Sequence, residues 1–150
     1  MNVDYEKAER EIQKILESYD PDAVLEKIVK YLYNNFKKYS WIGIYLLHGN
    51  KLVLSHWKGK NATEHNIIPI GKGICGAAAQ TGKTIVVPDV SKDKRYLSCF
   101  LSTKSEIVVP IKKNNKIIGE IDIDSDLLKA FDKKDLIFLE KTAKMLSNIL

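Results

Sequence analysis

The stretch that decides the fold is SEIVVPIKKNNKIIGEIDIDS, residues 105–125. Apolar and β-branched residues dominate both of its halves, and Asn114 and Asn115 between them are residues that accept a positive φ. The pattern predicts an antiparallel hairpin, with strands at 105–113 and 116–125 joined by a two-residue turn.

The sequence upstream of this hairpin predicts more strands. Residues 42–47 and 51–57 form a second predicted hairpin, because Gly49 and Asn50 between them also tolerate a positive φ. Two shorter strands are expected as well: an edge strand at 66–70, which contains a proline, and a buried strand at 84–87.

Apolar residues at helical spacing predict helices around these strands. Two helices occupy residues 1–40, and the second begins at Asp20-Pro21, where an acidic cap precedes a proline at the first helical position. A short helix is expected at 74–80 and a last one from about Asp132. The order of elements predicts an α+β fold, an antiparallel sheet covered by helices.

Length and composition limit the domain organisation. The chain has 150 residues, 45% hydrophobic and 29% charged, which suits one domain with one core. We expect a single domain over 1–150, with N-terminal helices at 1–40, the sheet and active-site loops at 41–130 and a C-terminal helix at 131–150. No apolar run matches a signal peptide or a membrane span, so we expect a soluble, cytoplasmic protein with no membrane partner. The net charge of +5 comes from scattered lysines, which disfavours nucleic acid as a partner.

The predicted strand at 116–125 carries three acids at alternate positions. Alternation places Glu120, Asp122 and Asp124 on one face and Ile121 and Ile123 on the other. A solvated polar face would explain the pattern, but aspartate is disfavoured in strands, so a cation, an ammonium group or a proton to deliver is the rival explanation. In a dry pocket, desolvation and mutual repulsion would raise the pKa of at least one carboxyl and leave it a proton donor.

Glu106 begins the partner strand and is a further candidate for this acidic group. With a strict two-residue turn it pairs with Ile123, which places it on the opposite face. A bulge or one-residue shift, which Pro110 or Gly119 could provide, is needed to bring it to the acids. Clustered carboxylates also bind metals, but no stretch matches a loop of closely spaced ligands, so no metal site is predicted.

The two cysteines, Cys75 and Cys99, lack the CxxC spacing of zinc and thioredoxin-like sites, and lone cysteines are usually small buried residues. However, Cys75 lies at the start of a predicted helix, which favours thiolate, and Cys99 lies in a loop rich in basic residues. Their separation of 24 residues permits a disulfide if the loop folds over the helix. Two reactive thiols beside protonated acids suit a redox step, although the residues alone do not say which thiol attacks.

Residues 76–84, GAAAQTGKT, look like a phosphate-binding P-loop. The spacing between the glycines is one residue too long, and the strand is expected after the motif instead of before it. A helix that ends at Gly82 explains the same residues, so nucleotide hydrolysis is disfavoured.

Four segments, together with Cys99, resemble the free methionine-(R)-sulfoxide reductases, which are single GAF-domain enzymes. In chain order the segments are WIGIYLL at 41–47, IPIGKGICG at 68–76, SEIVVP at 105–110 and IDIDS at 121–125. The match covers nearly the whole chain, and ordinary GAF sensor domains do not share the cysteine and acidic motifs together. The resemblance implies an oxidoreductase with a GAF fold that reduces free, not peptide-bound, methionine sulfoxide.

The resemblance also implies roles for individual residues. Cys99 matches the attacking cysteine and Cys75 a recycling one. Glu106, Asp122 and Asp124 match the carboxylates that bind the amino group and the sulfoxide oxygen. The aromatics around the substrate methyl group match Trp41 and Tyr45, which as strand residues could equally be core. No bound cofactor is implied; an external thioredoxin-like thiol reductant supplies the electrons, and a homodimer is expected.

The sequence departs from the family pattern in one place. The family commonly has a further cysteine shortly before the IPIGKGIC segment, where this chain has NATEHN at 61–66. Cys75 could then resolve Cys99 directly, an external thiol could reduce the sulfenic acid, or recycling could be lost. His65 is expected to be a surface loop residue and not a substitute. The alternative function is a non-catalytic small-molecule or redox-sensing GAF domain, which would not require Cys99 paired with Glu106, Asp122 and Asp124.

Overall fold

The structure is a computed structural model that describes residues 3–98 and 100–150. Cys99 lies outside the described residues. One six-stranded antiparallel sheet forms the centre, in the order β3-β2-β1-β6-β5-β4. The elements in chain order are α1 (Tyr5–Ile15), α2 (Pro21–Asn35), β1 (Trp41–His48), β2 (Lys51–Gly59), β3 (Ile67–Pro69), α3 (Gly73–Thr81), β4 (Ile85–Val87), the 3-10 helix η1 (Val90–Lys92), β5 (Ser105–Lys113), β6 (Lys116–Ser125) and α4 (Lys133–Ser147).

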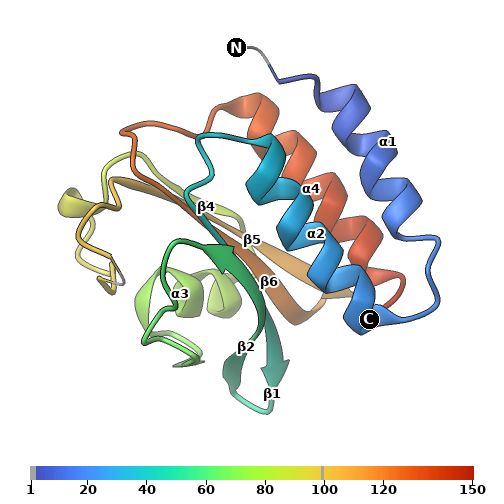
Figure 1. Ribbon diagram of the computed structural model, residues 1–150. Helices are drawn as coiled ribbons and strands as arrows, with labels where there is room; N and C mark the ends of the chain where they lie inside the picture. Colours follow the sequence, from blue (N-terminus) through green and yellow to red (C-terminus); the bar gives the residue numbers. More distant parts are fainter. Residues whose placement is uncertain (1–2, 99) are drawn as a thin grey trace.

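The sheet separates two layers of different composition. Helices α1, α2 and α4 lie together on one face, and α3 lies on the other (Figure 1). The three-helix side holds the larger apolar core, in which Ile121 and Ile123 of β6 pack against the helices. The α3 side holds a smaller apolar cluster that includes Trp41, Tyr45 and Cys75. The predicted α+β fold is therefore confirmed.

Local sequence signals explain how the elements begin and turn. Asn114 and Asn115 have φ values of 53° and 62°, as the predicted hairpin turn requires. The Asp20 side chain accepts from the backbone N–H of Asp22 at 3.1 Å and caps α2 ahead of Pro21. Gly82 ends α3 with a φ of 68°, so the P-loop look-alike is a helix end, as expected.

The expectation of a buried strand at 84–87 is wrong. Within the described part of the chain, β4 is the last strand of the sheet and pairs only with β5, and Val86 is 38% exposed. A run of apolar residues is typical of a buried strand, but it does not show whether a second neighbour is present. β4 is an edge strand that ends the sheet.

The three-helix side contains a buried acid that the sequence analysis did not single out. Asp135 of α4 is fully buried, and its carboxylate accepts from the hydroxyls of Tyr39 at 2.6 Å and Tyr5 at 3.0 Å. Lys38 forms a salt bridge with the same carboxylate, and the backbone N–H of Asp132 donates to it at 2.9 Å. This network ties α1, α4 and the segment before β1 together.

Among the helices of residues 3–98 and 100–150, none combines the length and the apolar character needed to cross a membrane.

Candidate active site

The acidic face predicted on β6 is present and dry. Glu120, Asp122 and Asp124 are 0%, 4% and 2% exposed, and the isoleucines between them point into the helical core instead. A merely solvated polar face would leave these carboxyls in water. Their burial therefore favours a site.

Glu106 joins the acidic face through a shift in register. It pairs with Asp124 and not with Ile123, because the pairing of β5 with β6 slips by one residue between Ile111 and Lys112. Ile111 pairs with Gly119 and Lys112 with Ile117, so the irregularity lies directly beside the glycine that the sequence analysis proposed for it. Glu106 is 5% exposed, and it completes a group of four buried carboxyls.

The aromatic residues of β1 lie over the same acids. Trp41 pairs with Asp124 and Tyr45 with Glu120, so both aromatic side chains share the face of the carboxyls and are almost fully buried. Gly43 between them faces the Trp41 ring, and a Cβ at this position would lie 2.3 Å from the indole. A glycine at position 43 is therefore required for the indole to lie against the sheet.

Cys75 enters the site from α3. Its sulfur, one oxygen of Glu106 and one oxygen of Asp122 all lie within 4.8 Å of one another, and all three residues are buried. The helix is held close to β3, since a Cβ on Gly76 would lie 2.6 Å from the carbonyl oxygen of Pro69. The fold thus brings together Cys75, the acids and the aromatics, and only the position of Cys99 among the predicted site residues is not described.

The expectation that Cys75 favours the thiolate is wrong. Burial raises the pKa of the Cys75 thiol well above its ordinary value, and the charges of Asp122, Glu120 and Glu106 raise it further. The field of a short helix does not compensate for these two effects. Cys75 is a free thiol in the structure, and it is held in the protonated form.

The four carboxyls behave as the clustering predicted. Burial is the main cause that raises the pKa of Glu106, Glu120, Asp122 and Asp124, and the charge of Asp122 adds to the rise in the other three. Carboxyls of this kind hold their proton to a higher pH than ordinary carboxyls do, and a carboxyl that holds a proton can donate it to an oxygen.

Several polar atoms in the site have no hydrogen-bond partner among residues 3–98 and 100–150. They are the indole N–H of Trp41, both oxygens of Glu120, and one oxygen each of Asp122 and Asp124. Buried polar groups are normally paired, so these atoms indicate a polar ligand that completes the site.

Comparison with known proteins agrees with this geometry. A family model described as GAF domain matches residues 20–150. The free methionine-R-sulfoxide reductase of Saccharomyces cerevisiae is 45% identical over 112 residues, which cover 72% of this chain and 61% of the yeast protein. The Escherichia coli protein of the same name is 34% identical over 128 residues, or 85% of this chain and 76% of that protein. The reduced form of the fRMsr of Staphylococcus aureus superposes with a TM-score of 0.92 at 37% identity and covers 99% of this chain and 96% of that one.

The chain belongs to the GAF-domain free methionine-R-sulfoxide reductases. This confirms the resemblance and its implication that the chain is an oxidoreductase, and it counts against a non-catalytic sensor domain.

The loop that lacks the family's further cysteine contacts the site at two points. The Tyr45 hydroxyl donates to the carbonyl oxygen of His65 at 2.8 Å. The His65 ring lies 3.3 Å from the carbonyl oxygen of Ser98, the residue before Cys99. In this reductase the loop at 61–66 therefore contacts both β1 and the segment that leads to Cys99.

Glu120 is the site residue to which the resemblance gives no role, since no motif of the resemblance includes it. Alternation with Asp122 was the available signal.

We expect Glu120→Met to stabilise the substrate-free protein by about 1–3 kcal/mol at neutral pH, because it removes a buried, unpartnered carboxyl and keeps its length. Above the ordinary carboxyl pKa the unfolded chain loses the Glu120 proton while the folded chain, with its raised pKa, retains it. The stability of the wild type should therefore fall as the pH rises through this range. Urea denaturation between pH 4 and pH 8 measures both effects. Glu17→Met, at an exposed position, is the control, and an equal gain in this control would contradict the explanation.

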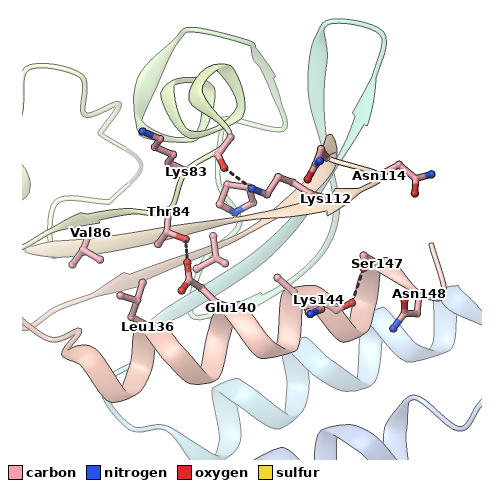
Figure 2. Close-up of a pocket in the computed structure, with 15 residues that line it drawn as sticks. Lys83, Thr84, Val86, Lys112, Asn114, Leu136, Glu140, Lys144, Ser147 and Asn148 are labelled. Carbon is pink, nitrogen blue, oxygen red and sulfur yellow. Dashed lines mark hydrogen bonds between the residues drawn. The ribbon is translucent and has the colours of Figure 1, made fainter.

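A cleft of about 780 Å³ lies elsewhere, between β5 and α4 (Figure 2). Two of the polar side chains that line it are paired: Thr84 donates to Glu140 at 2.8 Å, and Lys112 donates to the carbonyl oxygen of Gly82 at 3.0 Å. Val86 and Leu136 give the cleft an apolar part. It contains none of the buried acids or the thiol, so the chemistry is assigned to the site on the α3 side.

Proposed function

We propose that this protein reduces free L-methionine (R)-sulfoxide to methionine, with electrons from thiols. The observation that carries the proposal is the set of buried, proton-holding carboxyls beside a thiol and an unpartnered indole N–H. The yeast and Escherichia coli relatives bear the name of this activity, and the Staphylococcus aureus protein has also been solved in complex with its substrate.

The substrate is a zwitterion that carries a polar S=O group and an apolar methyl group. Ionised members of the group formed by Glu106, Asp122 and Asp124 neutralise its ammonium group. A protonated member donates to the sulfoxide oxygen, and Trp41 and Tyr45 enclose the methyl group. The dry surroundings strengthen each of these electrostatic contacts.

Cys99 is the attacking thiol in this proposal, since Cys75 is held in the protonated form. The Cys99 thiolate attacks the sulfoxide sulfur and forms an S–S bond, while the oxygen takes a proton from a carboxyl. The hydroxyl group then transfers to the Cys99 sulfur as both of these bonds to the substrate sulfur break, so that methionine leaves and Cys99 becomes the sulfenic acid. The thiol of Cys75 then condenses with this sulfenic acid, which forms a disulfide and releases water. A thioredoxin-like dithiol reduces the disulfide, and the protein needs no bound cofactor.

The test is turnover of separated epimers with dithiothreitol as the reductant. We expect methionine from the free (R) epimer, none from the (S) epimer, and at least a ~100-fold lower rate with the N-acetylated (R) epimer. Acetylation removes the ammonium charge and leaves buried carboxylates unpaired, which is strongly rejected in a dry site. A failure to form methionine from the free (R) epimer would overturn the proposal.

Recycling is tested by peptide mapping after one turnover without reductant. We expect a disulfide between Cys75 and Cys99. A persistent sulfenic acid at Cys99 would show instead that an external thiol completes the cycle. The cytoplasmic location and the homodimer remain expectations, and light scattering measures the latter.

A further inference from the structure

The fold assembles three possible metal ligands that are far apart in the sequence. Cys75 comes from α3, Glu106 from β5 and Asp122 from β6, and their ligand atoms lie within 4.8 Å of one another. The sequence analysis predicted no metal site because no loop carries closely spaced ligands. That argument does not apply to ligands contributed by a helix and two strands.

We propose that the reduced protein binds a divalent cation of the Zn²⁺ class at Cys75, Glu106 and Asp122. An ion in this position occupies the carboxylates assigned to the substrate and blocks the recycling thiol. The consequence for catalysis rests on the proposed function, whereas the binding itself does not.

The distances allow the three side chains to close on one ion. Zn²⁺ lies about 2.3 Å from a thiolate sulfur and about 2.0–2.2 Å from a carboxylate oxygen, so two ligands at a tetrahedral angle are roughly 3.5 Å apart. Closing from 4.8 Å requires movements of about 1 Å, which rotations of the Glu106 and Asp122 side chains can supply. Three protein ligands leave the fourth position to water.

Unpartnered atoms around the three ligands point to a cationic occupant. One oxygen of Asp122, one of Asp124 and both of Glu120 have no hydrogen-bond partner in the described part of the chain, and these residues are at least nine-tenths buried. A positive charge placed among them satisfies these acceptors. The substrate ammonium is one such charge, and a metal ion is another.

The ligand set selects the metal. When the ion displaces the proton of Cys75, one thiolate with two carboxylates suits Zn²⁺, Co²⁺ and Cd²⁺, whereas Mg²⁺ and Ca²⁺ prefer sites made of oxygen alone. Co²⁺ is a useful probe because thiolate ligation gives it a charge-transfer absorption band.

The test is Co²⁺ titration of the reduced full-length protein, followed by competition with Zn²⁺. We expect a thiolate-to-cobalt band at one equivalent that Zn²⁺ removes. Cys75→Ser should abolish the band, and Glu106→Gln should weaken Co²⁺ binding at least ~10-fold. Cys99→Ser should keep the band. His56→Gln, which removes a surface histidine paired with Asp22, should also keep it. Chemical denaturation of each variant establishes that it is folded.

Two outcomes would overturn the site: a band that survives in Cys75→Ser, or one that is lost in Cys99→Ser. The site and the proposed function can fail separately. A band that depends on Cys75 in a protein that does not reduce methionine sulfoxide supports the site and counts against the function only. If the metal-free protein reduces methionine sulfoxide but Co²⁺ titration gives no such band, the site is overturned and the function stands. If both hold, free methionine sulfoxide should weaken Co²⁺ binding.

Discussion

Replacing Cys99 with serine is expected to lower the rate of methionine formation at least ~1,000-fold. A serine hydroxyl is not ionised near neutral pH and forms no sulfenic acid, so the variant loses both the nucleophile and the oxygen acceptor. Rapid-quench measurement of methionine in the first turnover, with protein in excess over substrate, isolates this step from recycling.

The matched variant is Cys75→Ser, which keeps the attacking thiol and removes the recycling one. With substrate in excess and a protein dithiol as the reductant, it should form close to one equivalent of methionine per protein in the first turnover. It should then stop. If Cys75→Ser lost the first turnover and Cys99→Ser kept it, Cys75 would be the attacking thiol and the prediction would be wrong.

Asp135→Ala is expected to destabilise the protein by about 3 kcal/mol. The substitution leaves the hydroxyls of Tyr39 and Tyr5 without their acceptor in or near the core and removes the acid that completes the cap of α4. Burial and the negative charge of Asp135 raise the pKa of Tyr39, which is consistent with a tyrosine that donates to a buried carboxylate. Guanidinium denaturation at pH 7 measures the loss.

Two variants separate the parts of this effect. Asp135→Asn keeps an acceptor for a tyrosine and should lose about half as much. Asp132→Ala removes the N-cap side chain of α4, which accepts from the backbone N–H of Lys134 at 2.9 Å, and should cost about 1 kcal/mol. An Asp135→Ala variant no less stable than Asp132→Ala would show that the tyrosine contacts contribute nothing.

The parts of the fold that could be predicted from the sequence depend on near neighbours. The turn at Asn114 and Asn115 and the cap at Asp20 are set by the residues themselves and their immediate surroundings. The alternation that places Asp122 and Asp124 on one face needs only the geometry of a strand. These features were predicted correctly for that reason.

The parts that escaped prediction depend on contacts between distant residues. The thiolate at Cys75 was predicted from its helix, but strands more than 30 residues away supply the acids and the burial that oppose it. Asp135 meets Tyr39 and Tyr5 across 96 and 130 residues, and no periodicity encodes these partners. Whether β4 has a second neighbour is likewise a property of the whole sheet.

The division of the molecule by its sheet has a practical consequence for protein engineering. The helices that supply most of the apolar packing lie on one side, and the acids with their thiol lie on the other. Substrate preference can therefore be redesigned by changing residues on α3 and the loops of its side, while the opposite half keeps the chain folded. Conversely, heat resistance can be improved among α1, α2 and α4 without altering the groups that meet the sulfoxide.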